Sequence, residues 1–577
     1  MTVAQMPARF SDSNVRRGKW RVRQAVDRMM VTRRRFLSGT IAAAAPLAFA
    51  GNAFAPAGEP RALGTPDQLA WQDLEFGMFV HFAPNTWQNR EYDDLSTPLS
   101  AINPDIDTDN WAQCAVNLGA RYVVFVAKHA GGFCMWQTAT TPYSIGHTPW
   151  QGGHGDVLRD IAASCRKYGL RLGVYISPRD AYLGAGDGGV CKTPEKQAQY
   201  NAIYRQQLTE VLSRYGEMVE VWFDGSTVAA VADIVSEYAR HAAIFQGPSA
   251  TIRWVGNENG FAPYPLWDAE SIGDARSGVS TALDSDPDGG AWMPVECDVS
   301  IRRPNWFWST TNVKNLMTPD QLLEVYYRSV GRGAQLLLNV PPNRNGHIAD
   351  EDFVRAKEFG AEIRRRFGKS IAESAGSGGI LALDLPQPAR VDHVILQEDC
   401  RFGQRVRGFR VEGRADGQWI ELIKGSSIGH KRIVPVTPHV GSTLRLVVTQ
   451  SQGEARIRRF AAFNTGAEAP TGWDAPTQLW APNAVGKWTD FHFGVDLSKQ
   501  ITAAAQYRLR FIPESGDVRE IGDVRLLLNG VSEPRFIRED PAAKNALILT
   551  ITALGEKISV SGTIAGAASG TILLQKM

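Results

Sequence analysis

The chain has 577 residues, of which 44% are hydrophobic and 21% charged, and this is the composition of a folded protein rather than a disordered one. The formal net charge is +2, but residues 1–50 hold ten Lys and Arg against two Asp and so carry +8, which leaves −6 for the rest. An acidic body argues against nucleic-acid binding, and this length predicts about two or three domains.

The N-terminus has the layout of an export signal. The basic segment 32–37 (TRRRFL) precedes an uncharged, Ala-rich run that ends in Ala48-Phe49-Ala50, a small-x-small cleavage site. The Arg pair followed by x-Phe-Leu is typical of twin-arginine export. We predict that residues 1–50 are a signal peptide, that translation starts at Met29 or Met30, and that the mature protein is periplasmic or secreted.

Two kinds of segment are not expected in this chain. No stretch approaches about 18 apolar residues without interruption, so we predict no transmembrane helix. The six cysteines lie singly, without a CxxC pair, and four of them stand in periodic apolar segments. We therefore expect neither a disulfide framework nor a zinc site.

From residue 76 onward, short apolar runs alternate with helical patterns. The runs predict strands over 76–82, 122–127, 171–177, 220–223, 251–256 and 335–340. Helices are expected over 111–118, over 156–168, and after Thr193-Pro194 and Thr318-Pro319, where Thr is the N-cap and Pro the first helical residue. About seven or eight such units in roughly 300 residues favour a (β/α) barrel over a doubly wound sheet, because no glycine-rich phosphate turn follows the first strand.

After about residue 368 the helical periodicity gives way to strict alternation between turns, which predicts an all-β region. We divide the chain into the signal peptide 1–50, a catalytic TIM-like (β/α) barrel over 51–368, a β-sandwich over 369–465 and a second small β-sandwich over 466–577. Neither β module shows a catalytic cluster. Two roles stay open for them, which are carbohydrate binding and covering the barrel.

Chemistry-bearing side chains follow several of the predicted barrel strands. His81, His129, Tyr175, Asp224 and Glu258 stand at or after strand ends, and the active site of a (β/α) barrel lies at the C-terminal ends of its strands. Each residue alone also has a structural interpretation, as a turn, cap or solvated loop residue. Together, two carboxylates, two histidines and several aromatics on one face indicate a sugar site.

These segments resemble glycoside hydrolase family 29, the α-L-fucosidases, from about residue 71 to residue 348. The segments that carry the resemblance are FGMFVH (76–81), AKH and GFCMW (127–136), GVYISP (173–178), VWFDG (221–225), RWVGNE (253–258) and LLLNVPP (336–342). RWVGNE and the NVPP run resemble the branch of the family that prefers branched α-1,3/1,4-linked fucose.

The resemblance implies a retaining exo-glycosidase acting on a fucosylated oligosaccharide or glycoconjugate, and we expect no cofactor and no metal. Asp224 matches the nucleophile and Glu258 the acid/base. The matching substrate-binding residues are His81, Glu91 and His129 for fucose hydroxyls, Tyr175 in the same pocket, Trp222 near the C5 methyl group, and Trp306 in the pocket wall. The segment 369–465 resembles discoidin-like carbohydrate-binding sandwiches in its strand pattern.

Two departures from the family pattern leave the sugar and linkage open. The family's His-His-Asp-Gly-Phe reads His129-Ala130-Gly131-Gly132-Phe133 here, and its Glu-Trp pair reads Glu91-Tyr92. The alternatives are an exo-glycosidase for another sugar such as an α-L-galactoside, a non-catalytic carbohydrate-binding protein, and a metal-dependent hydrolase with His81, His129 and Asp224 as ligands. The absence of an HxH or HExxH spacing counts against the last.

Overall fold

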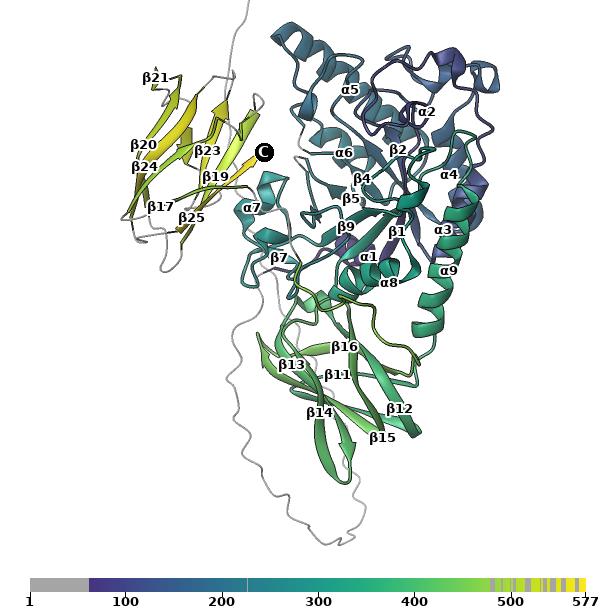
Figure 1. Cartoon of the computed structure of the whole chain (residues 1–577), viewed down its shortest axis with the longest axis vertical. Helices are drawn as coiled ribbons and strands as arrows, with labels where there is room; N and C mark the ends of the chain where they lie inside the picture. The colour runs from purple at the N-terminus through teal and green to yellow at the C-terminus, as the bar shows by residue number, and fades with distance from the viewer. Residues whose placement is uncertain are drawn as a thin grey trace, which may run out of the picture. The chain divides into compact units, whose positions relative to one another are not determined.

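Figure 1 shows the chain as a computed structural model. The structure describes residues 62–477 except 226 and 248, and then 483–488, 491–498, 500–501, 505–513, 520–529, 531–532, 537–539, 546–551, 557–565 and 570–576. The predicted signal peptide over 1–50 and the predicted start at Met29 or Met30 lie outside the described residues.

Eight parallel strands form a nearly closed barrel, which confirms the predicted TIM-like fold. In the order in which neighbours pair, they are β5 (Ala243–Phe245), β4 (Glu220–Trp222), β3 (Arg171–Ile176), β2 (Tyr122–Lys128), β1 (Phe76–Val80), β10 (Gln335–Asn339), β9 (Val295–Ser300) and β6 (Arg253–Trp254). A parallel bridge from Phe245 to Ile252 joins β5 to the start of β6 and completes the ring.

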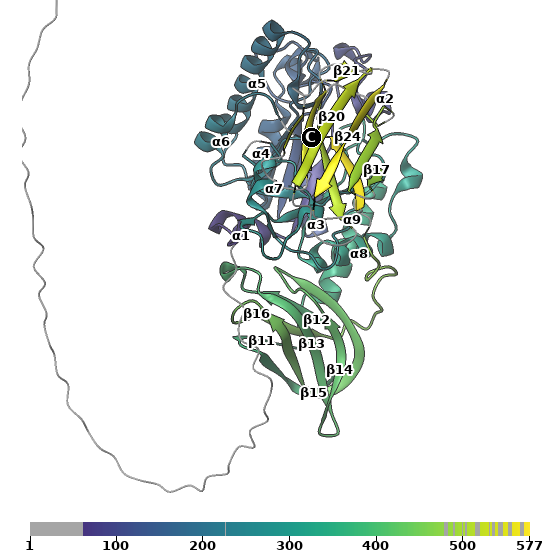
Figure 2. The same ribbon diagram turned by 90° about the vertical axis from the view of Figure 1, so that its left-hand side faces the viewer.

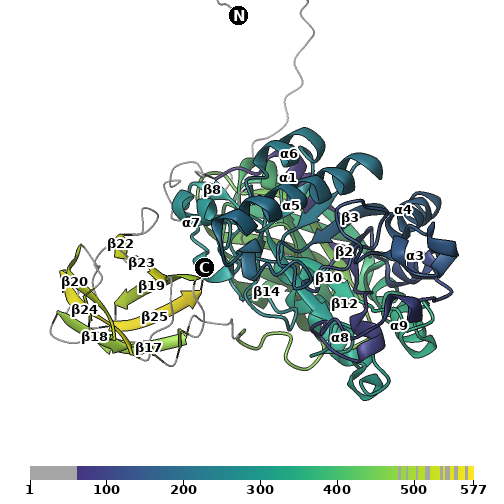
Figure 3. The ribbon, with the colours of Figure 1, turned by 90° about the horizontal axis from the view of Figure 1, so that it is seen from above.

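Helices surround these strands (Figures 1 and 3). They are α1 (Pro66–Gln72), α2 (Asn85–Gln88), α3 (Thr108–Leu118), α4 (Val157–Tyr168), α5 (Pro194–Arg214), α6 (Ala232–Tyr238), α7 (Ile272–Ser277), α8 (Pro319–Arg328) and α9 (Asp350–Phe367). Single 3-10 turns lie at Leu99–Ala101, Ile145–His147, Trp150–Gly153, Asp187–Gly189, Ala282–Asp284, Val313–Asn315, Val330–Arg332 and Cys400–Phe402.

The predicted helix starts are confirmed by their capping hydrogen bonds. The side chains of Thr193 and Thr318 accept from the backbone of Lys196 and Gln321, and each is followed by Pro in the first turn. Such a cap satisfies one of the backbone N–H groups that a helix N-terminus leaves free. The helix predicted over 156–168 begins one residue later, because Asp156 is its N-cap.

The strands are apolar along their length because both of their faces are covered. All seven residues of β2 and all five of β1 are buried. One set of side chains packs under the helices, and the other fills the barrel, where Phe79, Tyr122, Tyr175 and Trp222 belong to one cluster. The barrel is therefore a packed core with its chemistry at one end.

Three parts of the barrel differ from the sequence-based expectation. Strand β5 was not predicted, because it is only three residues long. The run 251–256 pairs as a strand only over β6, and the described residues between β5 and β6, which are 246–247 and 249–252, contain no helix. Strand β9 was not predicted, because Glu296 and Asp298 alternate with apolar residues and point away from the outer core. Glu296 is fully buried and Asp298 is 4% exposed, so this strand lines the barrel interior with acids.

The first all-β region is one antiparallel sheet of six strands (Figure 2). They are β11 (Ala372–Ser377), β12 (Ile380–Glu398), β13 (Val406–Ala415), β14 (Gln418–Gly425), β15 (Arg432–Ser451) and β16 (Arg456–Phe463). The pairing of β12 with β15 shifts register between Asp384 and Ala389, and side chains from both stretches share one core. A single folded sheet therefore supplies both layers of this β region.

The short strands β7 (Ala269–Glu270) and β8 (Ala291–Trp292) form a separate two-stranded sheet.

The second all-β region has two antiparallel sheets, which fits the predicted sandwich (Figure 3). One contains β17 (Asn483–Trp488), β25 (Gly570–Lys576), β19 (Ala505–Pro513), β23 (Ala546–Ile551) and β22 (Ile537–Glu539). The other contains β18 (His492–Asp496), β24 (Ile558–Ala565), β20 (Glu520–Leu528) and β21 (Val531–Ser532). Side chains of both sheets, such as Leu509 and Val560, belong to one buried cluster.

Candidate active site

The predicted nucleophile Asp224 lies two residues beyond β4. The hydroxyl of Tyr175, from β3, donates to Oδ2 of Asp224 over 2.9 Å. The Asp224 carboxyl is exposed to solvent, yet protein surrounds it closely enough that burial raises its pKa above the usual range. The Tyr175 hydrogen bond and the charge of Arg179 oppose that rise, because both favour the ionised form.

The predicted acid/base Glu258 lies four residues beyond β6 and is half-buried. Burial is the largest cause of a raised pKa at Glu258, and the charges of Asp224 and Glu91 raise it further. Arg303 opposes the rise through an ion pair in which Nη1 lies 3.1 Å from Oε2 of Glu258. The three carboxyl groups of Asp224, Glu258 and Glu91 are therefore close enough to interact electrostatically.

Rings from four barrel strands and one loop line the same site. The ring of His81 lies 5.8 Å from that of His129, 6.0 Å from Tyr175 and 5.2 Å from Trp306, between centroids. Tyr175 stacks on Trp222 at 5.8 Å. The structure thus brings His81, His129, Tyr175, Trp222 and Trp306 together.

Glu91 lies in the loop after α2 and is tied to the segment that carries Trp306. Its Oε1 accepts from the side-chain amide of Asn305 over 2.9 Å, and its Oε2 accepts from the backbone N–H of Trp306 over 2.8 Å. These two hydrogen bonds fix both oxygens of Glu91 and hold Trp306 against the pocket.

Both histidines are uncharged at neutral pH. Burial lowers the pKa of His81 well below its usual range, and the neighbouring His129 lowers it further. Burial, with a smaller contribution from the charge of Arg179, lowers the pKa of His129 to about 4. Neutral imidazoles both donate and accept hydrogen bonds, which suits them to bind hydroxyl groups.

A buried network under the pocket fixes the indole of Trp222. Its Nε1 donates to Oε1 of Glu296 over 2.7 Å, and its ring stacks on Phe245 at 3.6 Å with 4° between the planes. Glu296 also accepts from the hydroxyl of Tyr122, and Glu220 accepts from Trp71. Burial first, and their mutual repulsion in the case of Glu296, raise the pKa values of the two glutamates.

The structure explains the glycine that replaces the family's aspartate. A Cβ on residue 131 would stand 2.5 Å from Oδ2 of Asp93, so no side chain fits there. Asp93 comes from the loop after α2, and its Oδ2 accepts from the hydroxyl of Tyr143 over 2.6 Å. A carboxylate from another loop therefore fills the space beside Gly131.

Several site residues had no signal in the sequence. Arg303 precedes Pro304 in an unremarked loop, and Asp298 was hidden because β9 was not predicted. Trp254 donates to Oδ1 of Asp298 over 2.6 Å, and burial, then the charge of Glu258, raises the pKa of Asp298 well above its usual range. Asn339 stands in the LLLNVPP motif, but nothing in that motif shows that it contacts His81.

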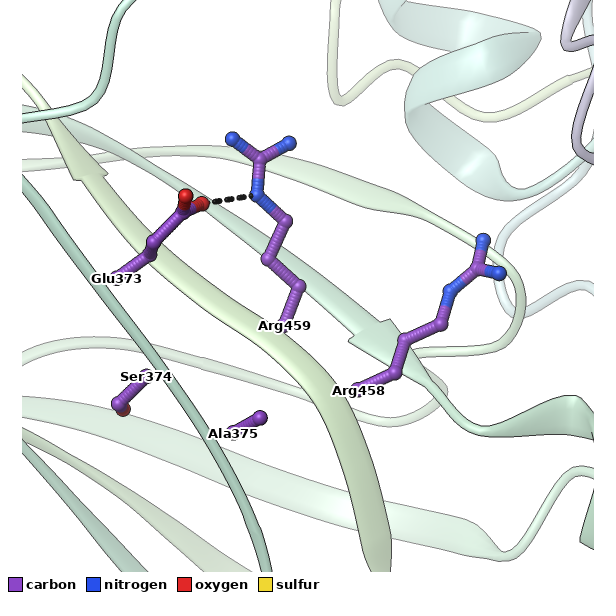
Figure 4. A pocket seen from close by; sticks show the side chains of 5 residues that line it. All are labelled: Glu373, Ser374, Ala375, Arg458 and Arg459. Atoms are coloured by element: carbon purple, nitrogen blue, oxygen red, sulfur yellow. Dashed lines mark hydrogen bonds and ion pairs between the residues drawn. The ribbon is translucent and has the colours of Figure 1, made fainter.

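A cavity of about 420 Å³ lies on the first β region, and none of the residues above lines it (Figure 4). It is lined by Glu373, Ser374, Ala375, Arg458 and Arg459. Nε of Arg459 donates to Glu373 over 2.6 Å, and Arg458 pairs with Asp73. Since both guanidinium groups are already paired with carboxylates, neither is an unpaired positive charge that would attract an anionic ligand.

Among the described residues, no three His, Cys, Asp or Glu side chains are grouped so as to hold a metal ion. All six cysteines are free thiols, and five of them are buried. In the part of the chain that the structure describes, no helix has the length and apolar character needed to cross a bilayer.

Comparison with known proteins extends these observations. A family model described as alpha-L-fucosidase matches residues 84–365. The chain is 35% identical over 448 residues to the alpha-L-fucosidase 1 homologue of Oryza sativa subsp. japonica, covering 69% of this chain and 84% of that protein. It is 31% identical over 446 residues to alpha-L-fucosidase 1 of Arabidopsis thaliana, covering 68% and 86%.

A solved structure of a GH29 fucosidase from Ruminococcus gnavus in complex with fucose has a TM-score of 0.63 to this chain. The two are 26% identical, and the match covers 72% of this chain and 97% of the other. With the barrel, its carboxylates and these relatives in agreement, the chain belongs to the α-L-fucosidase family, glycoside hydrolase family 29, and is a glycoside hydrolase.

Proposed function

We propose that the protein is an exported, retaining exo-α-L-fucosidase that removes terminal fucose, α-1,3- or α-1,4-linked, from glycans. Asp224 is the nucleophile and Glu258 the acid/base. The observation that carries the proposal is the convergence of these two carboxyl groups, from β4 and β6, on one ring-lined pocket. The fucose in the Ruminococcus gnavus complex and the names of the plant relatives support the choice of sugar.

Double displacement assigns opposite protonation states to the two carboxyl groups. Ionised Asp224 attacks the anomeric carbon while protonated Glu258 gives its proton to the leaving oxygen. The hydrogen bond from Tyr175 favours the ionised form of Asp224. Burial and the charges of Asp224 and Glu91 favour the protonated form of Glu258.

The second half of the cycle follows from the same charges. Once Asp224 is esterified by the sugar, its negative charge is gone and one cause of the raised pKa of Glu258 disappears. The ion pair with Arg303 then favours the ionised form of Glu258. An ionised Glu258 is the base that deprotonates the water which releases the sugar.

The pocket residues divide the recognition of the sugar. His81, His129 and Glu91 bind hydroxyl groups of the sugar in this proposal. The stacked rings of Tyr175 and Trp222 present an apolar wall, which suits the C5 methyl group of a 6-deoxy sugar. Trp306 closes the pocket on the side of His81.

The test is Asp224→Gly. We expect turnover of 4-nitrophenyl α-L-fucoside to fall about 1,000-fold or more, with partial recovery in azide through a glycosyl azide. Unchanged turnover would refute Asp224 as the nucleophile. Glu258→Gln, assayed on a branched Lewis-type fucosylated oligosaccharide beside the aryl fucoside, tests the acid/base and the linkage together. In Glu258→Gln we expect the branched sugar to lose more turnover than the aryl fucoside, because nitrophenolate leaves without a proton. In the wild type, cleavage of the branched sugar with little aryl activity supports the branch assignment.

A second candidate function is hydrolysis of an α-L-galactoside on the same scaffold. It is motivated by the rebuilt segment at Ala130 and Gly131, where Asp93 lies instead of a side chain on residue 131. Comparing aryl α-L-fucoside with aryl α-L-galactoside separates the two candidates. Family membership favours hydrolysis over the non-catalytic and metal-dependent alternatives.

The remaining assignments are also proposals. Cleavage after Ala50 places the mature enzyme in the periplasm or outside the cell, and N-terminal sequencing of precursor and mature protein checks both the start and the cut. We place the domain boundaries near residues 368 and 465. Binding of the isolated substrate glycan to a variant inactivated at Asp224, with and without residues 466–577, tests whether the second β module binds carbohydrate.

A further inference from the structure

Asn339, the last residue of β10, joins three strands at the pocket floor. It is fully buried and pairs in register with Phe79 of β1 and with Ser300 of β9. Its side-chain amide reaches across to His81, which follows β1, and to the segment that carries Trp306. One amide therefore contacts two residues to which we assign substrate binding.

The hydrogen bonds of Asn339 fix which end of its amide faces His81. Nδ2 donates to Oγ of Ser300 over 3.0 Å and to the backbone oxygen of Trp306 over 2.8 Å. A backbone carbonyl oxygen only accepts, so the group that faces it must be the NH2 end of the amide. Both amide hydrogens are thereby used, and Oδ1, an acceptor, is left facing His81.

That orientation determines the tautomer of His81. Nδ1 of His81 lies 2.9 Å from Oδ1 of Asn339. Two acceptors cannot share a hydrogen bond, so Nδ1 carries the hydrogen. A neutral imidazole has one N–H, and Nε2 is then a bare acceptor. No residue that the structure describes is hydrogen-bonded to Nε2.

The surroundings of His81 keep the ring neutral and in place. The rings of Phe79, Phe307 and Trp306 pack on it at 4.5, 5.3 and 5.2 Å. The titratable side chains that face it are His129 and Tyr175, and neither is a negative charge that would hold an imidazolium. Burial, then His129, lowers the pKa of His81, which agrees with a neutral ring.

We propose that Asn339 is a positioning residue that fixes His81 as its Nδ1–H tautomer, so that Nε2 accepts a hydrogen bond from a hydroxyl group of the sugar. This inference rests on the proposed function for the identity of the ligand, but not for the tautomer. The site therefore selects a hydroxyl that donates, and a fluorine or hydrogen at that ring position cannot replace it. The same amide of Asn339 donates to the backbone oxygen of Trp306, and the backbone N–H of Trp306 donates to Glu91, so both residues hold the backbone of Trp306.

The first test reads the tautomer without using activity. In protein labelled with ¹⁵N-histidine, His81 is assigned among the ten histidines by its loss in His81→Gln. We expect the neutral Nδ1–H tautomer in the wild type at pH 7, a change of tautomer in Asn339→Ala, and an imidazolium in Asn339→Asp, whose carboxylate favours the charged ring. An Nε2–H tautomer or an imidazolium in the wild type would overturn the inference.

The second test reads binding. Asn339→Ala should raise KM for the aryl fucoside about tenfold and change kcat less, because a ground-state hydrogen bond is weakened. In a series of fucosides in which one hydroxyl at a time is replaced by hydrogen or fluorine, replacement at one ring position should raise KM of the wild type about tenfold. The same replacement should change KM of Asn339→Ala little. An equal penalty at every position in both proteins would overturn the assignment of a donating hydroxyl to His81.

Gln335→Ala is the matched control. Gln335 is also a buried amide on β10, but it lies at the opposite end of the strand and donates to the backbone of Trp71. It should lower the melting temperature while leaving the His81 tautomer and KM as in the wild type. If the wild type hydrolyses no fucoside, the proposed function fails, and the histidine spectrum still decides the tautomer.

Discussion

At the scale of single residues, the pocket works through pairs of side chains from different strands. Tyr175 and Asp224 are one such pair and Arg303 and Glu258 another, each linked by a single polar contact. Because each contact favours one ionised carboxylate, each sets one limb of the pH dependence that we expect for kcat/KM. A change at either contact should therefore move mainly one limb, and the other less, because the charge of Asp224 also raises the pKa of Glu258.

Tyr175→Phe should move the acidic limb. Loss of the hydroxyl removes a hydrogen bond that favours ionised Asp224, so the pKa of Asp224 rises and the proposed nucleophile ionises only at higher pH. We expect the acidic limb of kcat/KM to shift upward and the plateau to fall about tenfold or more.

Tyr204→Phe is the control for this change. The hydroxyl of Tyr204 donates to the backbone of Ile176, on the same strand, and does not contact Asp224. A shift of the acidic limb in both variants would show that the effect comes from disturbing β3 rather than from the lost hydrogen bond.

Arg303→Met should move the alkaline limb. Removing the positive charge beside Glu258 raises its pKa, so Glu258 stays protonated as an acid to higher pH. Because both groups are partly exposed, we expect an upward shift of the alkaline limb of at most about one pH unit. Arg344→Met, whose guanidinium contacts the backbone of Thr86 and Trp87, should leave that limb in place, and an unmoved limb in Arg303→Met would contradict the role assigned to the ion pair.

The sequence indicated most residues of this pocket, but not the distant residues that hydrogen-bond or pair with them. Asp224, Glu258 and the two histidines follow apolar runs, so their place at strand ends was visible. Arg303 and Asn339 act through contacts with residues 45 and 258 positions away in the chain, and a single sequence does not show which distant residues meet. The sequence shows that Gly131 lacks the family's carboxylate, but it does not show that Asp93 lies beside Gly131.

At the scale of elements, buried acids connect opposite sides of the barrel. Glu220 comes from β4 and Glu296 from β9, and their donors come from α1, β2 and β4. An apolar-run criterion finds β2 and β10 but misses β9, whose inward residues are acids. Of the two barrel strands that sequence reasoning missed, β5 and β9, it is β9 that carries the polar floor of the pocket.

Glu296→Gln and Glu296→Ala should behave differently. Gln retains an acceptor for Trp222 and can donate to Glu220, whereas Ala leaves the indole N–H of Trp222 buried without a partner. In urea denaturation at pH 6, we expect Ala to lower the free energy of unfolding by about 2–4 kcal/mol and Gln by much less. Equal losses would contradict the positioning of Trp222 by Glu296.

The same pair predicts how stability depends on pH. An acid whose pKa is raised in the folded protein binds its proton more tightly there, so its contribution is present at low pH and is lost as pH rises through the folded value. The free energy of unfolding of the wild type should therefore decline as the pH rises above the ordinary pKa of a glutamate. In Glu296→Gln, urea midpoints from pH 5 to 9 should decline less.

At the scale of the molecule, the barrel and the first β region share charged contacts. Asp73 Oδ1 lies 2.8 Å from Nε2 of His430 and 2.7 Å from Nη1 of Arg458, and Glu75 pairs with Lys431. Burial tends to raise the pKa of Asp73, but these partners outweigh it and lower the value to about 2. The pKa of Glu75 is also below its usual value, because the charges of Lys431 and His430 outweigh the opposite effect of burial.

These contacts predict loss of stability in acid. An acid with a depressed pKa stabilises the fold above its unfolded value and loses that effect as pH falls toward the folded value. The melting temperature should therefore fall between about pH 4.5 and pH 2, and less steeply in Asp73→Asn than in the wild type. Asp416→Asn, in an exposed turn between β13 and β14, should keep the wild-type slope, and equal slopes in all three proteins would count against the contact.

The seam between β5 and β6 connects the two sides of the candidate active site. The backbone oxygen of Ile244 accepts from the N–H groups of Thr251 and Ile252, and the N–H of Ile244 donates to the side chain of Thr251, so the hydrogen bonds there converge on one residue. Asp224 follows β4 on one side of this seam, and Glu258 follows β6 on the other. The strands that carry the two carboxyl groups are thus joined across this seam, and the relative position of Asp224 and Glu258 depends on the hydrogen bonds of one residue, Ile244.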